Sequence, residues 1–191
     1  MRILKKKERK IKNFIKILIT IFFITNINTQ LFANETNAFS FKFPGSTGQE
    51  INMADYKGKT ILMFAACTEC GFRTQYKDAQ ELYDEYKDKG LMVIGISSDD
   101  LNVKESRTGI EINNFCSDRF GTTYPISDIV KIKTSSKNTH PFFVWAKTQK
   151  ISIQKNFTKI IIDKNGNIVK KINRETKPNS KKIKKIIDEI I

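Results

Sequence analysis

The sequence predicts an α/β domain with a mixed central sheet and helices on both faces. Two continuous apolar runs, TILMFAA at 60–66 and LMVIGIS at 91–97, are typical of strands buried on both faces. An amphipathic helical pattern separates them, and a strand–helix–strand unit of this kind implies parallel pairing. Two later apolar runs surround Asp-Lys-Asn-Gly-Asn at 163–167, a hairpin signal that adds antiparallel strands to the sheet.

The N-terminal elements lead into the first buried strand. Residues 39–45, FSFKFPG, alternate like an edge strand and end at Pro-Gly. Residues 51–59, INMADYKGK, predict a strand or a turn. After the first buried strand, apolar residues at three- and four-residue steps predict a helix that begins at Phe72 and ends in a C-cap at Gly90. These apolar residues are Phe72, Tyr76, Ala79, Leu82, Tyr83 and Tyr86.

The second half of the chain continues the alternation of predicted helices and strands. A polar stretch after the second buried strand predicts a loop, and residues 110–121 predict a helix that ends at Gly121. Pro141 stands at a predicted first helical position, and Ser180 can cap a final helix with a stripe of isoleucines. The predicted order is strand, strand, strand–helix–strand, helix, strand, helix, strand–strand, helix. That order describes the layers of a thioredoxin-like fold.

Residues 1–33 have the layout of a secretory signal peptide. A basic region at 1–16 precedes the apolar run ILITIFFI, and Ala33 offers a cleavage point. The apolar run is shorter than the roughly 20 residues that a membrane-spanning helix needs. The alternative is an uncleaved anchor or a basic amphipathic helix, in which case this segment alone would contact a membrane. Either way, residues 34–191 are expected to form one domain outside the cytoplasm, periplasmic or secreted.

The net charge of the chain, +14 over 191 residues, does not indicate a nucleic-acid partner. Residues 1–16 hold eight Lys and Arg and one Glu, so half of the excess lies in the N-terminal segment. No stripe of basic residues interleaved with aromatic residues appears in the remainder.

Three cysteines carry the candidate chemistry. Cys70 is predicted at a strand-to-helix junction, where unpaired N–H groups and the helix dipole lower a thiol pKa and favour a nucleophilic thiolate. A thiolate that meets a hydroperoxide is oxidised to sulfenic acid, which a second thiol can condense with. A structural zinc site needs four ligands, and three cysteines with the distant His140 are a poor set. No metal and no cofactor are therefore expected, and His140 is expected to cap a helix or lie at the surface.

Cys67 and Cys70 form a Cys-x-x-Cys pair, which leaves alternatives open. The pair resembles a dithiol that exchanges disulfides, yet the helical pattern begins after the second cysteine rather than at the first. The segment before the KIIID strand reads Asn-Phe-Thr, where a thioredoxin-type site would carry a cis-proline. Cys67 is thus interpreted as a buried structural thiol or as a second resolving thiol for Cys70.

The segment ILMFAACTECGFRTQY resembles the sequence around the active-site cysteine or selenocysteine of glutathione peroxidases. The resemblance continues, in the family's order, through LYDEYKDKGLMVIGISSDD, EINNFCSDRFGTTYPI, HPFFVWAK and NFTKIIIDKNGNIV. It implies that Cys70 is the peroxidatic residue and that Asn156 donates a hydrogen bond to the thiolate or the peroxide. It also implies that Cys116 is the resolving cysteine of the two-cysteine branch, which uses a dithiol reductant. The residues alone allow Cys116 to be a buried structural thiol, and its helix would have to unwind locally if the two cysteines lie too far apart.

Two positions depart from the family pattern. Lys104 stands where the family has glutamine, and Lys155 stands where it has tryptophan. Either these lysines approach Cys70 and stabilise its thiolate by charge, or they point into water and the site is weakened.

The leading hypothesis is an exported thiol peroxidase that reduces hydrogen peroxide or organic hydroperoxides and responds to oxidative stress. Cys70 would form the sulfenic acid, Cys116 would resolve it, and an external thiol or thioredoxin-like protein would reduce the disulfide. The alternatives are an extracytoplasmic thiol–disulfide oxidoreductase acting through Cys67 and Cys70, and a catalytically weak redox sensor. A monomer is expected, since the chain lacks the longer loop of the tetrameric family members.

Overall fold

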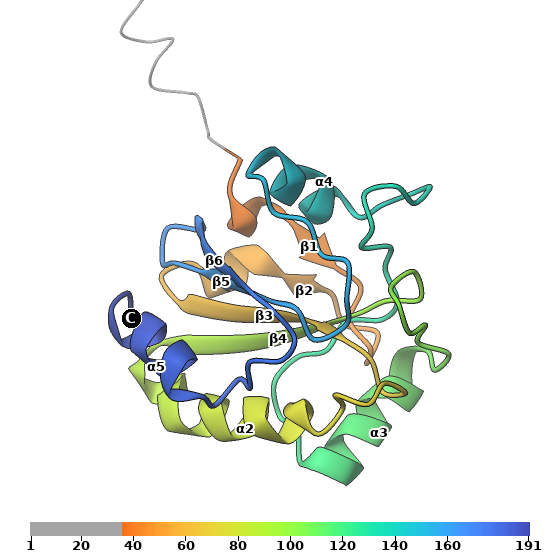
Figure 1. Cartoon of the computed structure of the whole chain (residues 1–191), viewed down its shortest axis with the longest axis horizontal. Helices are drawn as coiled ribbons and strands as arrows, with labels where there is room; N and C mark the ends of the chain where they lie inside the picture. Colours follow the sequence, from red (N-terminus) through yellow and green to blue (C-terminus); the bar gives the residue numbers. More distant parts are fainter. Residues whose placement is uncertain (1–35) are drawn as a thin grey trace, which may run out of the picture. The chain divides into compact units, whose positions relative to one another are not determined.

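The computed structural model describes residues 36–191, and every described helix and strand lies in the compact unit Asn37–Ile191 (Figure 1). The predicted signal peptide, residues 1–33, lies outside the described residues. Within the described part, no helix combines the length and the apolar character needed to cross a membrane.

A four-stranded mixed sheet forms the centre of the domain. Its strands lie in the order β4-β3-β5-β6, where β3 and β4 are parallel and the other two pairings are antiparallel. The two predicted buried runs form β3 and β4, and every residue of both strands is buried. The strand bounds are β3 Thr60–Ala66, β4 Leu91–Ser97, β5 Lys159–Ile162 and β6 Ile168–Ile172.

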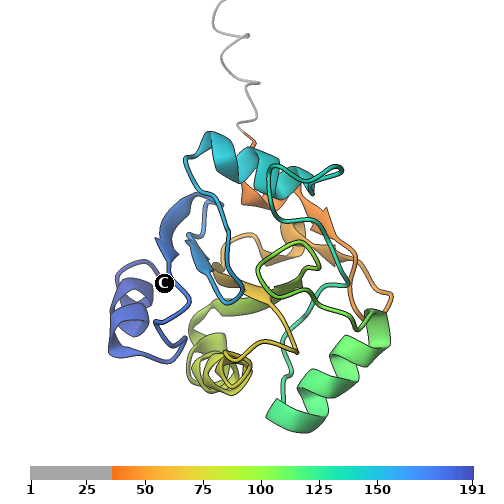
Figure 2. The same ribbon diagram turned by 45° about the vertical axis from the view of Figure 1, so that its right-hand side comes forward.

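Helices cover both faces of this sheet, as predicted. Alternate β3 residues point to opposite faces because the side chains of a strand alternate. Ile61 and Met63 pack with Phe142 of α4 (Pro141–Thr148) on one face. Leu62 and Phe64 pack on the other face with α2 (Gln75–Tyr86), α3 (Gly109–Phe120) and α5 (Lys181–Asp188). Figures 1 and 2 show α4 on the side of the sheet opposite to α2.

The N-terminal elements are shorter than predicted. The alternating segment 39–45 contains only the two-residue strand β1 (Lys42–Phe43), preceded by the 3-10 turn η1 (Ala38–Ser40). Its partner is β2 (Ile51–Asn52), which runs directly into the 3-10 turn η2 (Met53–Tyr56). A third 3-10 turn, η3 (Lys87–Lys89), ends at Gly90 in the left-handed region, φ 107°.

The prediction of a strand between α3 and α4 is wrong. Ile126 and Ser127 make only isolated bridges, to Gly95 and Gly45 respectively. Pro125 has no N–H to contribute to a ladder, so a continuous strand cannot extend through it.

His140 is the N-cap residue of α4. Its Nδ1 accepts a hydrogen bond from the Phe142 N–H at 3.3 Å, and its Nε2 lies 2.8 Å from the Lys42 carbonyl oxygen. Its ring stacks on Phe43 with centroids 4.2 Å apart. The capping role predicted for His140 is confirmed.

Candidate active site

Cys70 lies at the start of a segment of tight turns that leads into α2. The helix begins at Gln75, later than the predicted Phe72. Between them the backbone closes tight i→i+3 hydrogen bonds, from Arg73 N–H to Cys70 O and from Tyr76 N–H to Arg73 O, both at 3.1 Å. The Phe72 N–H remains available to the Cys70 sulfur, and a backbone donor of this kind stabilises a thiolate.

The surroundings of Cys70 lower its pKa to about 7. The largest cause is a hydrogen bond from the Cys67 thiol, followed among the favourable causes by the Phe72 N–H and the positive charge of Arg174. Burial and the negative charge of Glu105 act in the opposite direction. With this pKa, about half of Cys70 is thiolate at neutral pH. Cys70 is therefore the one cysteine of the described residues with a lowered pKa.

Arg174 supplies the positive charge that stabilises the Cys70 thiolate, the role considered above for Lys104 and Lys155. Its guanidinium carbon lies 4.5 Å from the centre of the Phe72 ring, and its Nε lies 3.2 Å from Glu175. Its carbonyl oxygen accepts hydrogen bonds from Gln75 Nε2 at 2.7 Å and from Lys159 Nζ at 3.2 Å. These contacts anchor the segment after β6 beside the Cys70 turn.

Lys104 and Lys155 are both exposed, and neither contributes to the pKa of Cys70. Lys155 instead lines a surface pocket with Lys171, and its charge acts on Glu175. The structure therefore supports the interpretation that these two lysines point into water rather than toward Cys70. The sequence contained no signal for Arg174, since it matches no motif and joins the site only through the fold.

Glu105 fixes the loop between Cys67 and Cys70. Its buried carboxylate accepts hydrogen bonds from the Thr68 N–H at 2.6 Å and from the Thr68 hydroxyl at 2.8 Å. The Thr68 hydroxyl accepts in turn from Arg107 Nη1 at 2.8 Å. A buried carboxylate with several donors is held firmly, so the loop has one well-defined shape.

Asn156 is buried, and its amide group pairs with the backbone of Val103. Its Oδ1 accepts from the Val103 N–H at 3.0 Å, and its Nδ2 donates to the Val103 carbonyl oxygen at 3.1 Å. The same carbonyl oxygen lies 3.9 Å from the Cys67 sulfur. In this structure, therefore, Asn156 positions a backbone carbonyl against Cys67.

Cys116 lies inside α3 and has no exposed surface. Burial raises its pKa to about 12. The Tyr76 hydroxyl lies close enough to affect that pKa, yet this buried hydroxyl has no hydrogen-bond partner of good geometry among the described groups. All three cysteines are free thiols and belong to the same apolar cluster, so the fold brings Cys67, Cys70 and Cys116 to one face of the sheet.

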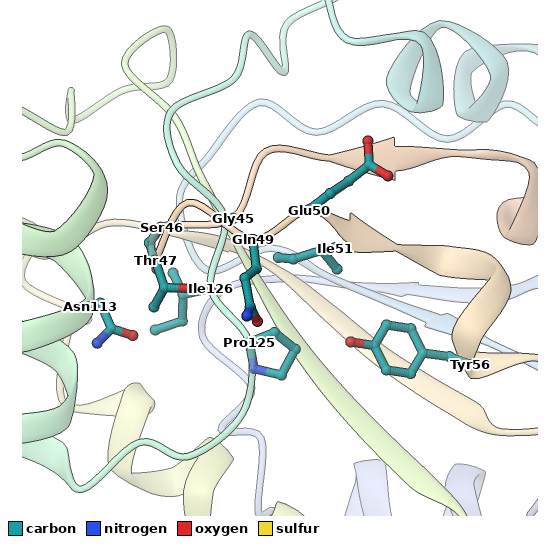
Figure 3. Close-up of a pocket in the computed structure, with 10 residues that line it drawn as sticks. All are labelled: Gly45, Ser46, Thr47, Gln49, Glu50, Ile51, Tyr56, Asn113, Pro125 and Ile126. Atoms are coloured by element: carbon teal, nitrogen blue, oxygen red, sulfur yellow. The ribbon is translucent and has the colours of Figure 1, made fainter.

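A cavity of about 140 Å³ lies apart from the cysteines (Figure 3). Residues 45–47, 49 and 50 of the β1–β2 connection line it, together with Ile51 of β2, Asn113 of α3 and Pro125. No cysteine lines this cavity. Within residues 36–191 no group of three or more His, Cys, Asp or Glu side chains is arranged to hold a metal ion.

Comparisons with known proteins identify the family. The family model described as "Glutathione peroxidase" matches residues 38–147. The chain is 36% identical to "Glutathione peroxidase homolog BsaA" of Halalkalibacterium halodurans over 149 residues, which cover 75% of this chain and 92% of the relative.

Solved structures confirm the thioredoxin-like fold. One, described as "Crystal structure of Trgpx in apo form", has a TM-score of 0.63 at 24% identity and covers 82% of this chain and 95% of its own. Another is a thiol:disulfide interchange protein of the thioredoxin family from Chlorobium tepidum TLS, with a TM-score of 0.59 at 21% identity. That match covers 81% of this chain and 97% of the other.

Proposed function

Since this chain belongs to the glutathione peroxidase family, we propose that it reduces hydrogen peroxide or organic hydroperoxides through the thiolate of Cys70. The family makes it a thiol peroxidase, an oxidoreductase that acts on a hydroperoxide and a thiol reductant. The observation that carries the assignment to Cys70 is the set of three groups that stabilise its thiolate, from Cys67, Phe72 and Arg174.

The first step is the attack of the Cys70 thiolate on the peroxide. The sulfur forms a bond to the distal oxygen, the O–O bond breaks, and the leaving oxygen takes up a proton to become water or an alcohol. The sulfur is oxidised to sulfenic acid and the peroxide is reduced. Cys70 is 4% exposed whereas Cys67 and Cys116 are fully buried, so a small hydroperoxide reaches Cys70 first.

Resolution by Cys116 completes the proposed cycle. A disulfide between Cys70 and Cys116 forms after the sulfenic oxygen has left as water, and an external thiol or thioredoxin-like protein reduces this disulfide. Because Cys116 is buried in α3, this bond requires a local opening of the helix. A protein dithiol is the proposed reductant in preference to glutathione.

The remaining parts of the proposal concern the setting. We propose that residues 1–33 export the domain, that it works outside the cytoplasm as a monomer, and that it contributes to the response to oxidative stress. The basic and apolar pattern of the N-terminal segment supports the export.

Stoichiometric oxidation tests the proposed function. The reduced protein receives one equivalent of hydrogen peroxide and is analysed by mass spectrometry after thiol alkylation. We expect peroxide consumption and oxidation of Cys70, and we expect Cys70→Ser to consume no peroxide. Unchanged Cys70 after this treatment would remove the peroxidase assignment.

Thiol–disulfide exchange is a second candidate, favoured by the closeness of Cys67 and Cys70, whose thiols shift each other's pKa. The two reactions separate in one measurement. An exchange enzyme would reduce a protein disulfide catalytically in the presence of a dithiol, with no dependence on peroxide.

A further inference from the structure

Cys67 and Cys70 lie at the two ends of a short loop of defined shape. Cys67 directly follows β3, and Cys70 opens the turn before α2. Glu105 holds Thr68 between them through two hydrogen bonds. Both cysteines belong to one apolar cluster, and two residues separate them, which is the spacing of Cys-x-x-Cys dithiols.

We propose that Cys67 is the thiol that first resolves the sulfenic acid of Cys70, so that the initial product of the reaction is a Cys67–Cys70 disulfide. This inference rests on the proposed peroxidase function. It decides between the two interpretations of Cys67 that the sequence left open, a buried structural thiol and a second resolving thiol.

The step is balanced without a further oxidant. The Cys67 sulfur attacks the Cys70 sulfur, an S–S bond forms, and the S–O bond of the sulfenic acid breaks. The departing oxygen combines with the proton of the Cys67 thiol and leaves as water. The two electrons that reduced the peroxide are thus taken from the pair of thiols.

The oxidation of Cys70 removes the main reason for Cys67 to remain protonated. In the reduced protein the pKa of Cys67 is raised, first by its hydrogen bond to Cys70, then by burial and by the Cys70 charge. A sulfenic acid is neutral, so the charge of Cys70 and the hydrogen bond that its thiolate accepts no longer raise the pKa of Cys67, whereas burial and the charge of Glu105 still do. The Val103 carbonyl, held by Asn156, remains 3.9 Å from the Cys67 sulfur and restricts its position.

Cys116 differs from Cys67 in the cause of its raised pKa and in its place in the fold. Burial is the largest cause of its raised pKa, and burial persists after Cys70 is oxidised. It lies in the interior of α3, where a new bond to Cys70 requires the helix to open. Cys67 lies outside any helix, so its reaction with Cys70 requires no helix to open, and Cys116 can act later, by exchange with the first disulfide.

The first disulfide would also be placed for reduction. Glu69 and Gly71, the neighbours of Cys70, are both exposed. A thiol reductant can thus approach the loop while α3 stays folded.

A single-turnover experiment on the full chain tests the inference. Reduced wild type, Cys67→Ser, Cys67→Ala and Cys116→Ser each receive one equivalent of hydrogen peroxide. Samples are quenched over time with dimedone for sulfenic acid and with an alkylating agent for thiols, and the disulfides are mapped. Two Cys67 variants are used because a buried serine hydroxyl and a smaller alanine side chain perturb the site differently, and thermal unfolding confirms that each is folded.

We expect the Cys67–Cys70 disulfide to be the earliest disulfide of the wild type, with little trapped sulfenic acid. The same disulfide should accumulate in Cys116→Ser, which lacks the thiol that exchanges with it. Both Cys67 variants should retain the sulfenic acid at least about tenfold longer, because exchange rates follow access and thiolate fraction. A Cys70–Cys116 bond as the earliest wild-type product, with equally fast resolution in the Cys67 variants, would overturn the inference while leaving the peroxidase intact. Absence of Cys70 oxidation in every protein would overturn the proposed function itself, and the inference with it.

Discussion

The carboxylate of Glu105 accepts hydrogen bonds from both the backbone N–H and the hydroxyl of Thr68, at 2.6 and 2.8 Å. These two residues are far apart in the chain, yet their contact determines the shape of the loop that carries Cys67 and Cys70. The same carboxylate also accepts from the Arg107 N–H at 3.0 Å, so it ties the loop after β4 to the loop after β3.

Replacement of Glu105 by Gln should destabilise the protein. The amide group places a donor where Thr68 already donates, and a buried donor without an acceptor costs about 1–3 kcal/mol. The free energy of unfolding from urea titration measures this loss. Glu189→Gln is the matched control, since Glu189 is exposed at the end of α5 and its replacement should change stability by less than about 0.5 kcal/mol. Equal free energies of unfolding for the two variants would show that Glu105 does not hold the loop.

Replacement of Arg174 by Gln should raise the pKa of Cys70 above about 7, because a positive charge that favours the thiolate is removed. The expected increase is about 0.5–1 unit, the size typical of one partly exposed charge. The rate of alkylation by iodoacetamide as a function of pH reports this pKa. Lys104→Ala and Lys155→Ala serve as controls and should leave it unchanged, since neither lysine acts on Cys70 in the structure. A larger shift in either lysine variant than in the arginine variant would contradict the assignment.

The rate of peroxide reaction should rise with pH through about 7 and then level off. The thiolate is the nucleophile, and the thiolate fraction of Cys70 rises from a small value to nearly one as the pH passes through its pKa of about 7. Cys67→Ala should move this midpoint to higher pH, because the Cys67 hydrogen bond is the largest cause of the lowered pKa. Stopped-flow measurement of peroxide consumption between about pH 5 and 9 covers the ionisation of Cys70 from mostly thiol to mostly thiolate. A midpoint that stays at the same pH in Cys67→Ala would exclude the hydrogen bond as its cause.

Replacement of Lys159 by Met should destabilise the segment that carries Arg174. Lys159 is fully buried, and its ammonium donates to Gln75 Oε1 and to the carbonyl oxygens of Arg174 and Thr176. In Lys159→Met each of the three acceptors loses one hydrogen-bond donor, and a buried polar group left without its partner costs about 1–3 kcal/mol.

Urea unfolding measures the effect of Lys159→Met, and Lys170→Met on the exposed side of β6 is its matched control. If the network also positions Arg174, the pKa of Cys70 should rise in Lys159→Met and not in Lys170→Met. A stable Lys159→Met protein with an unchanged pKa would show that the network has neither role.

The elements that the sequence predicted best are those with a purely local cause. The buried strands β3 and β4 follow from uninterrupted apolar runs, and the hairpin follows from Asp-Lys-Asn-Gly-Asn between two such runs. The short strands β1 and β2 and the missing strand near Pro125 depend on which partner is available. A local alternation contains no information about a partner.

The candidate site divides in the same way. The sequence identified Cys70 at a predicted strand-to-helix junction with unpaired N–H groups and offered Cys67 as a partner, and the family resemblance added Cys116 and Asn156. Only the tertiary structure decided which charges reach Cys70: it excluded Lys104 and Lys155 and brought in Arg174 from the segment after β6. It also directed the Asn156 amide to Val103 and left Cys67 beside Cys70. The physical reason is that the local backbone sets where unpaired N–H groups lie, whereas electrostatic and hydrogen-bond contacts across the fold depend on distances that sequence separation does not encode.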